Sequence, residues 1–114
     1  WMLPRMIGWA RAKELMNLGN RLPAEQALDW GLINRVYPDQ DFQAETLKLA
    51  QELANGPTVA LGITRQLFWD AWENSHGQQL DLEESLQPTT FATADAAEGG
   101  RAMLEKREAR FLGN

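Results

Sequence analysis

The chain has 114 residues, 44% of them hydrophobic, and a formal net charge of −5. This length suits one domain, and no apolar run approaches the roughly 20 residues that a membrane-spanning helix needs. Because the chain has no cysteine and a single histidine, His76, metal sites built from thiolates or histidines are excluded, as are disulfides. The composition indicates a soluble, cytoplasmic protein with no metal and no membrane partner.

Charge is unevenly distributed, because both ends of the sequence are basic and the middle is acidic. Residues 101–114 carry Arg101, Lys106, Arg107 and Arg110 against only two glutamates. A solvated surface explains such unevenness; the sharper alternative is that a basic end binds a phosphate. The chain also opens with tryptophan instead of methionine, so we expect it to be a C-terminal piece of a longer protein.

The start of the chain is predicted to hold an entry segment and a helix. Residues 1–7 form the entry segment, because Pro4 disfavours a helical conformation at Leu3. Apolar residues recur at helical spacing over residues 8–17. Gly19 is then placed to end this helix in the left-handed conformation.

A short helix and an extended segment follow. Pro23 suits the first position of a helix over residues 24–30, which Gly31 ends. Residues 32–37 alternate between two faces and stop at Pro38, which predicts a short strand or extended segment.

The stretch from Pro23 to Val36 also resembles half of a helix-turn-helix DNA reader. A recognition helix needs several basic residues, and only Arg35 is present. The acidic chain opposes phosphate binding as a whole, so DNA binding is a weak alternative and we expect no nucleic-acid partner.

Two apolar helices are predicted next. The first covers residues 42–54, with Asp39 or Asp41 as its cap. The second runs over residues 58–75 and is apolar well beyond a single stripe, which is typical of a central helix or one in an interface. Its aromatic residues could line a ligand pocket but favour a core or subunit interface: Phe68, Trp69 and Trp72.

Gly77 breaks the chain before a helix over residues 78–90, which Pro88 should kink or end. His76 lies at a helix end, where it can meet the negative end of the helix, and no serine or acid nearby makes it a catalytic base. Acid–base catalysis needs carboxyl groups of altered pKa in a cleft. The carboxylate pairs of this helix instead indicate a solvated face: Asp81/Glu84 and Glu83/Glu84.

The last predicted helix runs from about Asp95 to Arg110. Thr93 or Asp95 can cap it, and Asp95 with Glu98 has the spacing of a capping box. The pair Gly99-Gly100 costs on the order of 1 kcal/mol per glycine against alanine, which suggests that something large lies against this face.

The basic end of this helix is the main candidate binding site. Lys106 and Arg110 would share a helix face, with Arg107 beside them, so they could bind a phosphate. The competing interpretation is that these cations pair with acidic residues of the same chain. No glycine-rich phosphate loop, nucleophile elbow or metal motif is present. The residues alone therefore predict a mainly α, helical interaction or lid region with no complete active site.

Several short motifs, in this order, resemble the enoyl-CoA hydratase/isomerase (crotonase) family along essentially the whole chain. Each motif is weak alone, and the combination is specific. The motifs are Leu3-Pro4-Arg5 with Ile7-Gly8, Ala10-Arg11-Ala12, Gly19-Asn20-Arg21-Leu22, Ala24-Glu25-Gln26-Ala27, Gly31-Leu32-Ile33-Asn34-Arg35-Val36, Phe91-Ala92-Thr93 with Asp95, Glu98-Gly99, and Glu105-Lys106-Arg107.

The resemblance implies the C-terminal helical part of a crotonase-like (ClpP/crotonase) α/β fold. Residues 1–38 would be the end of the core, and residues 39–114 a lid that also builds a homotrimer or hexamer. In the family, an N-terminal spiral of ββα turns supplies the oxyanion-hole N–H groups and the acid/base carboxylates. No catalytic residue therefore transfers to this sequence, and the isolated chain should be inactive.

The resemblance also implies an acyl-CoA substrate, with coenzyme A as part of that substrate and no separate cofactor. Lys106 matches a family lysine near the adenine and phosphate end of coenzyme A. The aromatic contact that some members make before the Phe-Ala-Thr motif is replaced here by Gln87-Pro88. Trp1 is more similar to the ring-opening isomerases of phenylacetate breakdown than to hydratases with glutamine there. The alternative from another class is an autonomous helical oligomerisation module.

Overall fold

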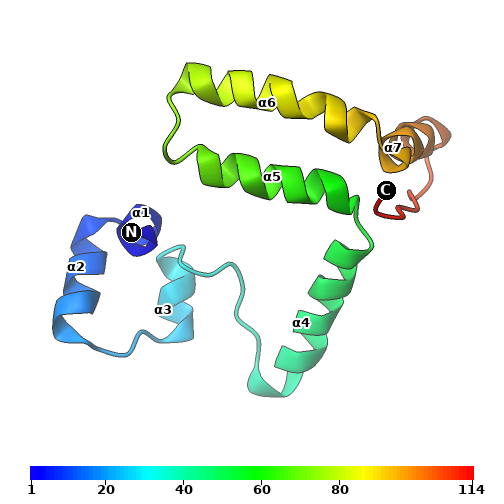
Figure 1. The fold of residues 1–114 in the computed structure, drawn as a ribbon. Helices are drawn as coiled ribbons and strands as arrows, with labels where there is room; N and C mark the ends of the chain where they lie inside the picture. Colours follow the sequence, from blue (N-terminus) through cyan, green and yellow to red (C-terminus); the bar gives the residue numbers. More distant parts are fainter. The chain divides into compact units, whose positions relative to one another are not determined.

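Seven α-helices and no strand make up the regular structure in the computed structural model, which describes residues 1–114 (Figure 1). The mainly α character that the sequence predicts is therefore confirmed. The helices are α1 (Met2–Ile7), α2 (Trp9–Leu18), α3 (Ala24–Asp29), α4 (Asp39–Ala54), α5 (Thr58–Asp70), α6 (His76–Phe91) and α7 (Ala94–Glu105).

The chain divides into two units, Trp1–Glu45 and Thr46–Asn114, and the division falls inside α4. The predicted division after residue 38 concerns the core and lid of the family fold, and it stays a prediction. None of the helices is both long and apolar enough to cross a membrane.

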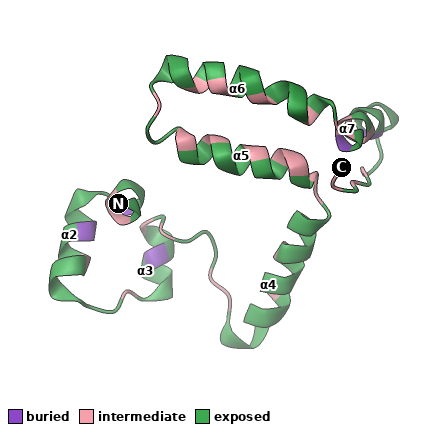
Figure 2. Ribbon diagram, viewed as in Figure 1, coloured by how far each residue is buried: buried purple, intermediate pink, exposed green.

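The first unit begins with a helix where an entry segment is predicted. The prediction for residues 1–7 is wrong because Pro4 lies in the first turn of α1, where a missing N–H removes no intrahelical hydrogen bond. Three buried apolar residues, one each from α1, α2 and α3, form the small core of this unit (Figure 2): Ile7, Ala12 and Ala27.

Glycines end the next two helices as predicted. Gly19 has φ 64° and ψ 20°, and its N–H donates to the carbonyl of Leu15 at 3.0 Å. Gly31 follows α3 with φ 75°. Pro23 precedes α3 as its N-cap residue, one position earlier than predicted.

Residues 32–37 form neither a strand nor a second helix after α3. The strand alternative of the prediction is wrong, because a strand needs a neighbour to pair its N–H and C=O groups and this chain offers none. The other alternative, an extended segment outside a sheet, is not contradicted. The second helix that a DNA reader would require is also missing from Trp30 to Pro38.

The second unit pairs α5 with α6, which lie side by side (Figure 1). A side-chain amide helps to join them, because Nε2 of Gln79 in α6 donates to the carbonyl of Leu67 in α5 at 3.2 Å. The helix predicted over residues 58–75 ends earlier, at Asp70. The N–H groups of Glu73 and Asn74 both donate to the Asp70 carbonyl at 3.0 Å and turn the chain.

A capping box starts α6 where the sequence was expected to break. The Ser75 side chain accepts from the Gln78 N–H, and the Gln78 side chain accepts from the Ser75 N–H. Gly77 therefore lies inside the first turn of α6, and the predicted break there is wrong. Pro88 does not end this helix, which continues to Phe91.

The caps predicted for α4 differ as well. Both Asp39 and Asp41 lie within its first turn, and the carbonyl of Pro38 accepts the first N–H groups, from Asp41 at 2.9 Å and Phe42 at 3.0 Å. The two carboxylates still favour the positive end of the helix by charge.

Candidate functional site

The densest polar network lies where residues 106–114, here called the return segment, fold back along α7. Thr93 starts α7, because its Oγ1 accepts from the Ala96 N–H at 3.0 Å. This cap confirms one predicted alternative. The predicted capping box of Asp95 and Glu98 is wrong, because both side chains bind the return segment instead.

Asp95 is buried, with 3% of its surface exposed. Its Oδ1 accepts from the Leu112 N–H at 2.7 Å, and its Oδ2 accepts from the Gly113 N–H at 2.9 Å. Its own N–H donates to the carbonyl of Asn114 at 3.2 Å. One residue of α7 thus fixes the last three residues of the chain.

Glu98 lies one helical turn further along α7, and its side chain is 14% exposed. Its Oε1 accepts from Arg107 at 2.6 Å and from the Arg110 N–H at 3.0 Å. Its Oε2 accepts from Arg107 at 3.0 Å and from Arg101 at 3.3 Å. The pair with Arg107 is therefore bidentate, which is the stronger geometry for a guanidinium and a carboxylate.

These bonds favour the charged forms of both partners. The hydrogen bond from Arg107, followed by the Arg110 N–H, lowers the pKa of Glu98 to about 2. The hydrogen bonds to Glu98 and Glu105 raise the pKa of Arg107 above its usual range. For Arg107, pairing within the chain is the interpretation that the structure supports.

Lys106 follows α7 in the left-handed conformation, with φ 54° and ψ 41°, and it is the only residue other than glycine with positive φ. It is exposed, and the ion pairs of this region use Arg101 and Arg107 instead of Lys106. The left-handed conformation costs roughly 1–2 kcal/mol for a residue with a Cβ.

The prediction that this helix continues to Arg110 is wrong, since α7 ends at Glu105. Lys106 and Arg110 therefore share no helix face. The reversal at Lys106 sends the chain back, and the Phe111 ring lies 3.6 Å from where a Cβ at Gly99 would stand.

A large group therefore lies against Gly99, as the sequence suggests, and it is a side chain of the return segment. That separation is an ordinary van der Waals contact, and the space at Gly100 is open. Nothing within the chain requires a glycine at either position.

An open hollow of about 840 Å³ separates α7 from the return segment. Three arginines line it together with three carboxylates, so their charges balance. These residues are Asp95, Glu98, Arg101, Arg107, Glu108 and Arg110. Lys106, directly after α7, is the cation that lies outside this balanced set.

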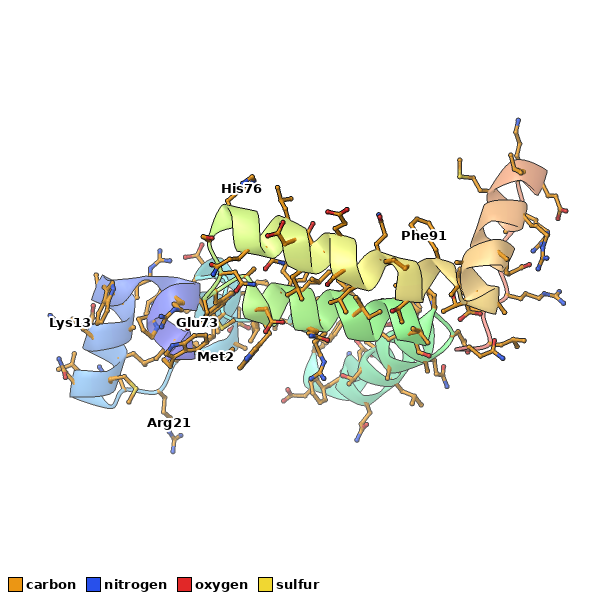
Figure 3. All side chains as sticks on the ribbon, turned by 45° about the horizontal axis from the view of Figure 1, so that its top comes forward. Met2, Lys13, Arg21, Glu73, His76 and Phe91 are labelled. Atoms are coloured by element: carbon orange, nitrogen blue, oxygen red, sulfur yellow. The ribbon has the colours of Figure 1, made fainter.

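The other candidates show no convergence on a site. His76 is the first residue of α6, at the positive end of that helix, so its predicted contact with a negative end is wrong. His76 and Phe91 mark the two ends of α6 and both point away from α5 (Figure 3). The carboxylates of α6 are exposed, as predicted: Asp81, Glu83 and Glu84. No group of three or more acidic or histidine side chains is arranged to hold a metal ion.

The aromatic residues at the end of α5 and in the turn after it do not form a core in this chain. Phe68 is 71% exposed, Trp69 is 59% exposed and Trp72 is 37% exposed. Trp69 lines a shallow hollow with its helix neighbours, and neither Phe68 nor Trp72 joins it there. The three side chains thus do not converge on one pocket.

Sequence reasoning missed the role of Asp95 and Glu98 in holding the return segment. Their partners are largely backbone N–H groups, which carry no sequence signal. The capping box at Ser75 was detectable, because Ser-x-x-Gln at residues 75–78 has the motif's spacing.

The helices and motifs described above are those of a known class. The model of the enoyl-CoA hydratase/isomerase family matches residues 1–114. The chain belongs to this family. It is 43% identical over 113 residues to the 1,2-epoxyphenylacetyl-CoA isomerase of Escherichia coli, covering 99% of this chain and 43% of that protein.

Solved structures agree. The enoyl-CoA hydratase of Polaromonas matches with a TM-score of 0.91 and 31% identity, over 98% of this chain and 44% of the other. The enoyl-CoA hydratase of Mycobacterium tuberculosis matches with a TM-score of 0.89 and 28% identity, over 98% and 44%. The chain thus has neighbours of crotonase-like fold and spans less than half the length of these relatives.

Proposed function

We propose that this chain is part of an enzyme that acts on acyl-CoA thioesters as a hydratase or isomerase. The observation that carries the proposal is the family match along all 114 residues. Its relatives include an isomerase of a CoA thioester and enoyl-CoA hydratases. Because the chain spans under half of those proteins, the activity belongs to the whole protein.

The chemistry requires stabilisation of an enolate. The thioester carbonyl develops negative charge, two backbone N–H groups stabilise it, and carboxylates move protons or activate water. We assign no catalytic residue in this chain. Its one buried carboxylate, Asp95, is occupied by backbone N–H groups, and Glu98 is occupied by arginines.

We place the chain as the C-terminal helical region of the family fold, with residues 39–114 covering the acyl pocket and forming a homotrimer or hexamer. The absence of strands supports this placement, because the spiral core of the family is built from ββα turns. The complete gene tests it: acid/base carboxylates should be encoded upstream of Trp1. A cytoplasmic location and a role in fatty acid metabolism also stay predictions.

Lys106 is the residue that we assign to coenzyme A. It carries an exposed cation on a backbone conformation that normally favours glycine. Unfavourable backbone conformations persist where function or the surrounding structure requires them. Coenzyme A would be part of the substrate, with no further cofactor.

Two measurements test the assignment. The isolated 114-residue chain should not turn over crotonyl-CoA, because the catalytic groups are elsewhere; turnover would contradict this division. In the whole protein, Lys106→Ala should weaken coenzyme A binding about tenfold in a calorimetric titration, the loss of one charge-assisted contact. Unchanged affinity would reject the Lys106 contact.

The substrate class favoured by similarity is a ring-epoxide aryl-CoA thioester. The 43% identity to the E. coli isomerase supports it, as does Trp1. The whole enzyme should then convert 1,2-epoxyphenylacetyl-CoA faster than crotonyl-CoA. The reverse order would favour a hydratase.

A helical oligomerisation module is the second candidate. Twenty large hydrophobic residues are exposed, and no large side chain is fully buried. Sedimentation with and without coenzyme A separates the candidates, because a pure association module should not respond to coenzyme A.

A further inference from the structure

We infer that Asp95 and Glu98 are positioning residues that fix Lys106 by holding the return segment against α7. The inference rests on the proposed function in one respect, namely that Lys106 contacts coenzyme A. Its structural part stands on the hydrogen bonds of α7 alone.

Hydrogen bonds of its backbone hold the return segment at four of its last five residues. The N–H groups of Arg110, Leu112 and Gly113 donate to the two carboxylates, and the carbonyl of Asn114 accepts from Asp95. The N–H groups of an irregular segment have no neighbouring strand or helical turn to accept their hydrogen bonds. The two carboxylates act as the acceptors instead. The path of the segment is therefore determined by two residues of α7.

Lys106 is the first residue of the return segment, directly after the end of α7. The Arg107 N–H donates to the carbonyl of Ala102 at 3.1 Å, and the Lys106 N–H donates to that of Met103 at 3.3 Å. Both bonds belong to the helix end and hold the backbone on either side of Lys106, while Asp95 and Glu98 anchor the residues that follow, from Arg110 to Asn114. The helix-end bonds stabilise the left-handed conformation of Lys106, and the anchored residues after it add to them by fixing the direction in which the chain leaves α7.

The same carboxylates also determine which cation is neutralised. Arg107 pairs with both Glu98 and Glu105, and Arg101 shares Oε2 of Glu98 with Arg107. Glu98 and Glu105 are therefore engaged by arginines, and none of these ion pairs uses Lys106, which leaves the lysine charge for an anionic ligand. A guanidinium suits this role because it binds a carboxylate in a bidentate manner and a lysine does not.

A double-mutant cycle with coenzyme A as the probe tests the inference in the whole protein. Asp95→Asn keeps the shape of the side chain and replaces one acceptor by a donor that faces an N–H. We expect Asp95→Asn, and separately Glu98→Gln, to weaken coenzyme A binding about tenfold. In a Lys106→Ala background, neither change should weaken it further. Glu84→Gln, on the exposed face of α6, is the matched control and should have no effect.

Amide hydrogen exchange supplies a readout that does not depend on the ligand. Asp95→Asn should increase exchange at Leu112 and Gly113 and leave that of α5 and α6 unchanged. Unchanged exchange at both amides would overturn the anchoring, and additive losses of affinity with Lys106→Ala would overturn the action through Lys106. If Lys106→Ala alone leaves affinity unchanged, the proposed contact is rejected and with it the ligand part of the inference. The exchange result then decides the structural part by itself.

Discussion

α7 and α5 lie in the same unit and differ in where their contacts are made. The N-terminal half of α7 binds the return segment through Asp95 and Glu98, and both Asp95 and Ala102 are buried. α5 has no buried residue, although it is the more apolar helix, and Phe68 is 71% exposed. The difference teaches that α7 is specified by polar bonds inside this chain, whereas the apolar surface of α5 stays largely exposed in it, so we expect a partner outside the chain to cover that surface.

The largest effect should come from Asp95→Ala, which removes the carboxylate that joins α7 to the return segment. It leaves two backbone N–H groups without their charged acceptor, at a cost of about 3 kcal/mol in the free energy of unfolding. Chemical denaturation of the whole protein measures it. Asp41→Ala, an exposed aspartate in the first turn of α4, is the control and should cost under about 1 kcal/mol. Equal losses would show that α7 is no better specified than α4.

Phe68→Ser tests the other side of the comparison. If α5 packs on a partner, the change should weaken association about tenfold in sedimentation, as expected when a buried interface aromatic is truncated. Stability of the isolated chain should change by no more than about 0.5 kcal/mol, because the side chain is exposed. Gln66→Ser, also exposed on α5, should leave association unchanged. A loss of stability without a change in association would place Phe68 in a core of this chain.

Gly100→Ala asks whether α7 also meets a surface outside the chain. The space at Gly100 is open, so alanine should stabilise α7 by about 1 kcal/mol in thermal unfolding. Gly99→Ala should gain about as much, because its Cβ would make only an ordinary van der Waals contact with the Phe111 ring. If Gly100→Ala instead weakens assembly of the whole protein, a neighbouring surface approaches α7 there, and the contrast with α5 would be smaller than the chain alone shows.

Lys106→Gly separates stability from binding. Removing the Cβ relieves the left-handed conformation and should stabilise the fold by roughly 1 kcal/mol. Coenzyme A affinity should fall at the same time, because the cation is lost. If stability and coenzyme A affinity both rise, Lys106 has no role in binding. If stability and affinity both fall, the lysine side chain supports the fold.

The sequence predicts the helices well where glycine, proline and apolar spacing agree, as at Gly19 and Gly31. It fails where the partner is distant or absent. Residues 32–37 have a strand pattern but no strand to pair with, and Pro4 is tolerated because it falls in a first turn. The sequence predicts that the last helix continues to about Arg110. It cannot predict the return segment, because the backbone hydrogen bonds that hold this segment to Asp95 leave no pattern of residue types. The basic residues alone mark Lys106 as a candidate phosphate contact and the resemblance assigns it to coenzyme A, but neither predicts its left-handed conformation.

The smallest effect concerns pH and again separates the two helices. The hydrogen bond from Arg107 lowers the pKa of Glu98 to about 2, below its value of about 4.3 in an unfolded chain. Glu98 therefore stabilises the folded state fully above about pH 4.3, and this contribution is lost as the pH falls toward 2. Unfolding measured between these pH values should show a fall in stability that Glu98→Gln reduces and that Glu84→Gln, on the exposed face of α6, leaves in place. If both variants follow the unmodified protein, the charge of Glu98 is not what holds the return segment, and the backbone bonds of Asp95 must hold it alone.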